Sequence, residues 1–225
     1  MRTAYREHLD AFSHDLVVMC DLVDAVMTKA SRALLRASLQ SAEDALSTEE
    51  EVAEIASRCE ARAVELLALE GPVARDLRQV VSSIYIVEDF RRMGALAMHI
   101  ASTARRRHPA PVIPEDQRDN FERFAQLVAD MAAQTRELLL EPDAQAAVAL
   151  SKDDDSVDAV QQRVMGMLNQ EQWQGTVTQA VDATLISRYY ERYADHCVSV
   201  AARVIYLSTG MTRSEYLARE DTPSL

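Results

Sequence analysis

The sequence predicts an all-α protein of long helices, organised as two tandem three-helix bundles. Only 5 glycines and 6 prolines occur among its 225 residues, whereas average usage would supply about 27. Strand-rich domains need turn residues every ~8–12 positions, so this scarcity disfavours them. Apolar side chains instead recur at alternating steps of three and four, which is the spacing of the buried face of a helix.

The first three helices are predicted over residues 3–36, 40–70 and 73–107. The second ends at Gly71 and the third starts after Pro72, because proline suits the first turn of a helix. The first helix has the clearest periodicity. Its apolar seam consists of Tyr5, Leu9, Phe12, Leu16, Met19, Val23, Val26, Ala30 and Ala33.

The last three helices are predicted over residues 115–140, 143–171 and 176–209. A linker with three prolines, residues 108–114, precedes them, and Gly210 follows the last one. The apolar seam of the last helix consists of Ile186, Tyr189, Tyr193, Cys197, Val200, Val204 and Leu207.

The two halves are predicted to be copies of one three-helix unit. The apolar spacing of the second helix is repeated 105 residues later, where Val52, Ile55 and Cys59 correspond to Val157, Val160 and Val164. Short connections make neighbouring helices antiparallel, which gives an up-down-up bundle in each half. The predicted domains are 1–108 and 115–210, followed by a polar tail over 211–225.

Charge and hydropathy limit the possible functions. The chain carries 36 acidic and 24 basic residues, a formal net charge of −12. This excess repels phosphate backbones and anionic lipid, so nucleic acid is not expected as a partner. No apolar run approaches the ~18 residues of a membrane span, and the charged N-terminus lacks the apolar region of a secretory signal. We therefore expect a cytoplasmic protein without membrane insertion, whose cysteines (Cys20, Cys59 and Cys197) are buried thiols.

Two pairs of carboxylates have a spacing that favours cation binding. Asp154 and Asp158 lie four residues apart in the fifth helix, as do Glu191 and Asp195 in the sixth. Like charges at this spacing are destabilising unless neutralised, and clustered carboxylates bind hard cations and iron. On a helical wheel Glu191 and Asp195 point away from the apolar seam, so the site is expected outside the bundle.

Two other interpretations of these acids stay open. They could form an ordinary solvated face, or they could complement the dipole at a helix N-terminus. His196, next to Asp195, is either a further ligand or an ordinary polar residue.

Other chemistries lack their motifs. The sequence contains no G-x-x-x-x-G-K-[ST], G-x-G-x-x-G, Glu-x-x-His or Gly-x-Ser-x-Gly pattern. This disfavours phosphate-cradling loops, ferritin-like di-iron sites and serine hydrolases. The three arginines at 105–107 are explained by complementarity to a helix C-terminus, with a phosphate or partner contact as the alternative.

Two motifs carry a resemblance to a known family. Residues 72–78 read Pro-Val-Ala-Arg-Asp-Leu-Arg, and residues 190–196 read Tyr-Glu-Arg-Tyr-Ala-Asp-His. They resemble the Pro-Val-Ala-x-Asp-Leu-Arg and Glu-Arg-x-x-Asp-His motifs of PhoU, a family of phosphate-uptake regulators. The resemblance covers residues 1–211, and Arg-Met-Gly-Ala-Leu-Ala at 92–97 is similar to the actinobacterial branch.

The resemblance implies a regulator of phosphate homeostasis with two symmetric three-helix bundles. Such a protein is an adaptor between the ATPase subunit of a phosphate ABC transporter and a phosphate-sensing histidine kinase. It acts in two-component signalling as a negative regulator of the phosphate-starvation response, and it is expected to be a homodimer. The family binds metal through an Asp-x-x-x-Asp and a Glu-x-x-x-Asp pair in each repeat. Here the second repeat matches with Asp154, Asp158, Glu191 and Asp195, which would hold a divalent metal or an iron cluster.

The first repeat departs from this pattern. Its equivalent residues are Glu49, Ala53, Arg91 and Ala95, so three of the four carboxylates are absent. Arg91 would repel a metal ion. We therefore expect at most one metal cluster per chain, in the second half.

The favoured hypothesis is a non-enzymatic adaptor. The alternative is a metal-dependent helical-bundle enzyme that uses the carboxylates of the second half, which requires open coordination positions and a pocket. A purely structural helical bundle is a third possibility.

Overall fold

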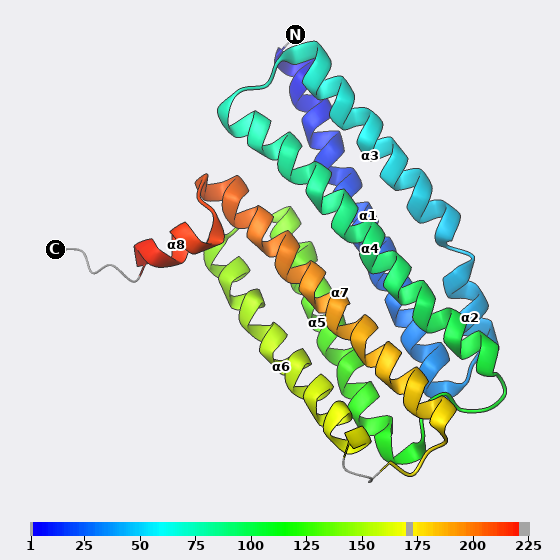
Figure 1. Cartoon of the computed structure of the whole chain (residues 1–225). Coiled ribbons are helices and arrows are strands. Elements are labelled where there is room, and N and C mark those ends of the chain that lie inside the picture. The colour runs from blue at the N-terminus through cyan, green and yellow to red at the C-terminus, as the bar shows by residue number, and fades with distance from the viewer. Residues whose placement is uncertain (1, 170–172, 221–225) are drawn as a thin grey trace.

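A computed structural model describes residues 2–169 and 173–220, and within these ranges the chain is helical without strands (Figure 1). The all-α prediction is confirmed. The helices are α1 (Arg2–Arg36), α2 (Leu39–Leu46), α3 (Glu49–Glu70), α4 (Ala74–Arg107), α5 (Arg118–Leu140), α6 (Ala144–Asn169), α7 (Val177–Thr209) and α8 (Arg213–Glu220), with the 3₁₀ turn η1 (Glu115–Gln117) before α5.

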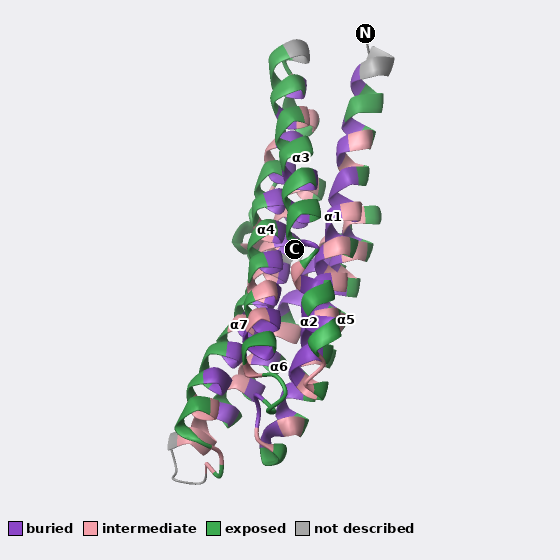
Figure 2. Cartoon of the chain, turned by 90° about the vertical axis from the view of Figure 1, so that its right-hand side faces the viewer, coloured by how far each residue is buried: buried purple, intermediate pink, exposed green. Residues whose placement is uncertain are grey.

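The two halves, α1–α4 and α5–α7, lie side by side as elongated bundles. Helix α4 packs against α7 on one side of the molecule and α1 packs against α5 on the other, while α3 and α6 flank this central group (Figure 1). Buried residues follow the inner faces of the helices (Figure 2). They form a single cluster that includes residues from both halves.

The core contains the whole predicted seam of α1 and five of the seven predicted seam residues of α7, whereas Tyr189 and Leu207 are only partly buried. All nine seam residues of α1 are buried, from Tyr5 to Ala33. Helix α7 also buries residues outside its predicted seam, including Tyr190 and Glu191, because it contacts α4, α5 and α6 at once. The prediction for the cysteines is confirmed, since all three are buried and free. Burial raises the pKa of the Cys59 thiol to about 11.

The predicted helix over 40–70 is wrong in one respect, because it is two helices. Ser38 caps α2 by accepting a hydrogen bond from the backbone N–H of Ser41 at 3.2 Å. The helix ends at Leu46 with Ser47 as its C-cap, and the Thr48 hydroxyl donates to the carbonyl of Asp44 at 3.0 Å. The counterpart α6 is continuous. Leu39 and Ala144, the first residues of α2 and α6, are also 105 positions apart, which agrees with the duplicated unit.

The polar tail contains the short helix α8. It starts after Gly210, whose φ of 76° is the left-handed conformation that favours glycine. Thr212 precedes α8, and its backbone N–H donates to the Glu215 carboxylate at 2.8 Å. Residues 170–171 of the predicted fifth helix and 221–225 of the tail lie outside the described ranges. In the part that is described, no helix combines the length and apolarity needed to cross a membrane.

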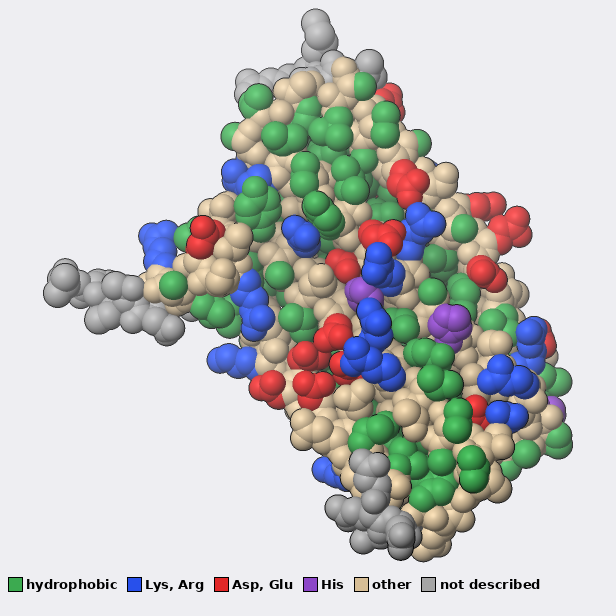
Figure 3. All heavy atoms as spheres, viewed as in Figure 1, with side chains coloured by type: hydrophobic (Ala, Val, Ile, Leu, Met, Phe, Trp, Pro, Cys, Tyr) green, Lys and Arg blue, Asp and Glu red, His purple; other side chains and the backbone are tan. Residues whose placement is uncertain are grey.

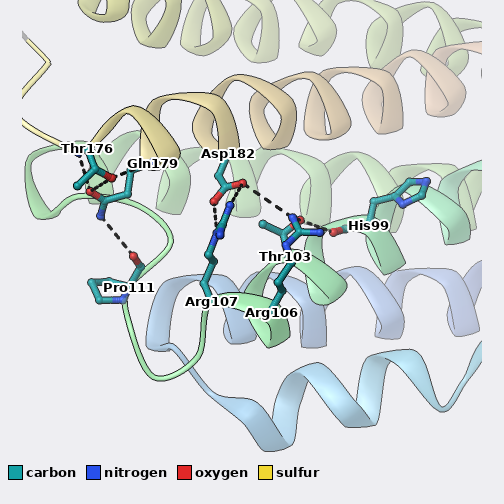
Figure 4. A network of polar contacts seen from close by, with 8 residues as sticks. All are labelled: His99, Thr103, Arg106, Arg107, Pro111, Thr176, Gln179 and Asp182. Carbon is teal, nitrogen blue, oxygen red and sulfur yellow. Dashed lines mark hydrogen bonds and ion pairs between the residues drawn. The ribbon is translucent and has the colours of Figure 1, made fainter.

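Polar contacts join the two halves near the C-terminal end of α4. Asp182 of α7 pairs with Arg107 and Arg106 of α4, and the Gln179 side chain donates to the carbonyl of Pro111 in the linker (Figure 4). Arg106 and Arg107 therefore form ion pairs with the second half of the chain, in addition to complementing the C-terminus of α4.

Candidate functional site

The four predicted ligands lie on the adjacent helices α6 and α7. Burial and, in decreasing order, the negative charges of Asp195, Asp158 and Glu191 together raise the pKa of Asp154 to about 6. Burial, followed by the charge of Asp195, also raises the pKa of Glu191. The structure thus brings these carboxylates near enough to repel one another.

Two oxygens of this group have no hydrogen-bond partner among the described residues. They are Oδ1 of Asp154 and Oε2 of Glu191, and both are buried. A buried oxygen without a hydrogen-bond partner lowers the stability of the folded protein. A positive charge beside these two oxygens would therefore be stabilising. The predicted position outside the bundle is right for Asp195, which is exposed, and wrong for Glu191, whose exposed fraction is 8%. Glu191 is buried because α7 packs against three other helices.

Two neighbouring side chains already contact this acidic group. Arg188, one turn earlier on α7, donates a hydrogen bond to Oε1 of Glu191. Gln134 of α5 donates to Asp153 at 2.8 Å. Arg188 therefore neutralises part of the charge that a cation would neutralise.

The chemistry of the donors fits a hard cation or iron, because all four side chains are carboxylates. Their arrangement fits less closely. Within residues 2–169 and 173–220, no three His, Cys, Asp or Glu side chains stand close enough to hold a metal ion. Binding would require the carboxylates to turn toward one another and Glu191 to exchange Arg188 for the ion.

His196 does not join the four carboxylates. Its Nδ1 lies 2.9 Å from Oδ1 of Asp89 on α4, and both side chains are largely buried. The contact crosses between the halves, and the sequence interpretation missed Asp89 because no local spacing relates it to His196. Figure 3 shows the resulting band of His, acidic and basic side chains across the face formed by α4 and α7.

The first half has a different arrangement at the equivalent positions. Arg91 donates to Glu60 of α3 at 2.9 Å, and Ala53 and Ala95 are exposed. Glu49 is the first residue of α3, directly after the break from α2. At this position of the first half, Arg91 therefore forms an ion pair with Glu60 in place of a carboxylate that could bind a metal ion.

Comparison with known proteins matches both halves. A family model described as "PhoU domain" matches residues 16–104 and residues 121–204. The two matches follow the division into α1–α4 and α5–α7.

The chain is similar over nearly its whole length to two proteins of Mycobacterium tuberculosis. It is 43% identical over 210 residues to "Phosphate-specific transport system accessory protein PhoU homolog 2", a match that covers 93% of this chain and 99% of that protein. It is 36% identical over 215 residues to "PhoU homolog 1", with coverages of 96% and 97%.

Two crystal structures share the fold. PhoU from Pseudomonas aeruginosa superimposes with a TM-score of 0.81 at 22% identity, covering 92% of this chain and 100% of that one. The phosphate transport system regulatory protein PhoU from Streptococcus pneumoniae gives a TM-score of 0.80 at 23% identity, with coverages of 92% and 98%.

Proposed function

The chain belongs to the PhoU family and is of the actinobacterial type, and from this premise we propose that it is an accessory protein of a phosphate transport system that restrains the phosphate-starvation response. The observation that carries the proposal is the 43% identity, over 93% of the chain, to a protein named as such an accessory protein. Both copies of the repeat match the family domain.

The proposed role is a non-enzymatic, cytoplasmic adaptor. Its partners would be the ATPase subunit of a phosphate ABC transporter and a phosphate-sensing histidine kinase. The face formed by α4 and α7 supports this role, because it exposes large apolar side chains on both helices. These include Leu77, Ile84 and Tyr85 on α4, and Val177, Val181 and Leu185 on α7.

A second copy of the chain would compete for the same face if the protein forms a homodimer. Light scattering of the purified chain, alone and with the ATPase subunit, separates the two cases. A dimer that dissociates when the ATPase binds would show that the two contacts overlap.

Deletion of the gene in the native host tests the regulatory role. We expect phosphate-starvation genes to be expressed even in high phosphate, and the wild-type gene on a plasmid to restore repression. Unchanged expression in the deletion strain at high phosphate would reject the proposal.

We also propose that Asp154, Asp158, Glu191 and Asp195 bind a divalent metal or iron. The buried oxygens without partners and the mutual repulsion of the carboxylates support this site. The test is metal analysis of protein that has been dialysed against chelator, reloaded and desalted. We expect bound metal in the wild type and its loss in Asp154→Asn with Asp195→Asn.

The exposed Asp155→Asn serves as the control, since it removes one carboxylate charge beside the site without removing a predicted ligand. Equal metal content in all three proteins would refute the site. Metal that is retained in the double variant but lost in Glu49→Gln would move it to the first half.

A further inference from the structure

A cleft lies between the C-terminal half of α1 and the N-terminal half of α5. It has a volume of about 360 Å³, and its polar lining consists of Thr28, Ser31, Arg32, Arg36, Arg118, Glu122 and Gln126. A second hollow of about 550 Å³ adjoins it and shares Arg36 and Arg118. Because α1 and α5 lie behind α4 and α7 in Figure 1, the cleft is on the side of the molecule away from the α4–α7 face.

Two arginines of this cleft have uncompensated charge. Arg32 and Arg36 are four residues apart on α1 and exposed, so their guanidinium groups are neighbours on one helix face. Neither forms an ion pair or hydrogen bond with any residue in the described part of the chain. Arg118, across the cleft, is bound to Glu122 at 2.9 Å and lies 3.9 Å from Glu115. Acidic residues outnumber basic ones by twelve in this chain, yet these two guanidinium groups on the α1 side of the cleft have no carboxylate partner among the described residues.

A buried hydroxyl adds a donor. The hydroxyl oxygens of Ser31 and Tyr190 are 2.8 Å apart. Tyr190 is completely buried, and burial raises the pKa of its phenol, so the phenol keeps its proton. Within the described residues Ser31 is the one hydrogen-bond partner of the Tyr190 hydroxyl, and the phenol proton is best satisfied by donation to Ser31. The Ser31 hydroxyl, 6% exposed, then has its own proton free for a ligand in the cleft.

We propose that this cleft binds a small phosphate-bearing anion through Arg32, Arg36 and the Ser31 hydroxyl. Guanidinium groups match phosphate oxygens in bidentate geometry. A group with three or four oxygens can satisfy two arginines and a hydroxyl together, which a carboxylate with two oxygens does less well. Inorganic phosphate and nucleoside phosphates share this chemistry.

The groove between α4 and α7 is the rival site, because it is lined by Arg92, Arg188 and Arg192. Two of these three arginines are paired with carboxylates. Arg92 is bound to Glu88 at 2.9 Å, and Arg188 is bound to Glu191. An anion would have to displace these carboxylates there, whereas Arg32 and Arg36 require no such exchange.

Isothermal titration calorimetry of the full chain tests the proposal, with inorganic phosphate, ADP and ATP as separate titrants. We expect at least one of them to bind, and Arg32→Gln with Arg36→Gln to weaken that binding at least tenfold. Ser31→Ala should weaken it several-fold, while Tyr190→Phe should retain it, because the Ser31 hydroxyl stays free. Which titrant binds more tightly identifies the source of the phosphate group.

The matched control is Arg92→Gln with Arg192→Gln, which removes the same charge from the rival groove. Absence of binding by all three titrants overturns the proposal, as does binding that is lost in this control but kept in Arg32→Gln with Arg36→Gln. The measurement uses purified protein alone. Failure of the calorimetry would therefore leave the adaptor role standing, and failure of the gene deletion would leave the anion site standing. The proposed anion site goes beyond the adaptor role.

Discussion

Asp182 of α7 accepts two hydrogen bonds from the guanidinium group of Arg107 of α4, at 2.7 Å from Nε to Oδ2 and 3.3 Å from Nη2 to Oδ1. The aspartate is almost completely buried, at 2% exposure, and Arg106 lies 3.9 Å from its Oδ1 (Figure 4). This bidentate pair connects the two halves, because each helix belongs to a different repeat.

Asp182→Ala should lower the free energy of unfolding by about 1–3 kcal/mol. Loss of one partner of a fully buried ion pair costs about 3–5 kcal/mol, but Arg107 is partly exposed and water can solvate it. Urea unfolding measures the change. Glu88→Ala, which breaks the exposed pair with Arg92 within α4, is the control and should cost at most about 0.5 kcal/mol. Equal effects of the two variants would contradict the special role of Asp182.

Tyr190→Phe should lower the stability of the protein, whereas Tyr193→Phe should not. Both tyrosines are completely buried. The Tyr190 hydroxyl bonds to Ser31, so its removal should cost about 1 kcal/mol. The Tyr193 hydroxyl has no partner among the described residues, so Tyr193→Phe should be neutral or stabilising by about 1 kcal/mol. Thermal unfolding of both variants checks this, and destabilisation by Tyr193→Phe would show that its hydroxyl is satisfied.

Gly94→Ala should stabilise the protein by about 0.5–1 kcal/mol, because alanine is the better helix former. A Cβ at this buried position would lie 3.5 Å from Cγ1 of Val52 and 3.7 Å from Cγ2 of Val23, which are ordinary contacts. Gly71→Ala is the matched comparison. Its φ of 53° is left-handed, so alanine there should cost about 1 kcal/mol. A lower melting temperature for Gly94→Ala would mean that α4 and its neighbours cannot accept one more methyl group.

Asp154 should make the protein less stable above pH 6. Its pKa is raised from 3.8 to about 6, so the folded chain binds this proton more tightly than the unfolded chain does. The free energy of unfolding therefore rises as the pH falls from about 6 to 4, because Asp154 becomes protonated. Above pH 6 the ionised carboxylate lowers the free energy of unfolding by its full amount. Asp154→Asn should remove it, raising the free energy of unfolding at pH 8 by about 1 kcal/mol after allowance for solvent screening.

Unfolding in chelator at several pH values measures this difference. The advantage of Asp154→Asn should disappear below pH 4, and the control Asp155→Asn should stay close to the wild-type pH dependence, because Asp155 raises the pKa of Asp154 less than Asp195, Asp158 and Glu191 do. Parallel curves for wild type and Asp154→Asn would contradict the prediction.

Much of the fold follows from local sequence signals. Gly71, Pro72 and Gly210 lie at helix boundaries, since their backbone preferences are intrinsic to the residue type. The break between α2 and α3 had no glycine or proline to indicate it. The hydroxyls of Ser47 and Thr48 there donate to the carbonyl of Asp44 near the end of α2, and such residues also occur inside helices.

The candidate site was predictable only in part. The i, i+4 pairs place Asp154 with Asp158 and Glu191 with Asp195 by helix geometry alone. The burial of Glu191 and the contact of His196 with Asp89 depend on how α7 packs against α4, α5 and α6. The periodicity of one helix identifies an apolar face but does not show how many neighbours cover it.

The shared core bears on how a duplicated gene can diverge. A single three-helix unit would expose the apolar surfaces that α1 and α4 bury against α5 and α7, so on its own it would associate with another copy. Fusion makes that association intramolecular and gives it a high effective concentration. Pairing of the halves then no longer requires identical sequences, and one copy can lose its carboxylates, as at Ala53, Arg91 and Ala95, while the other retains them.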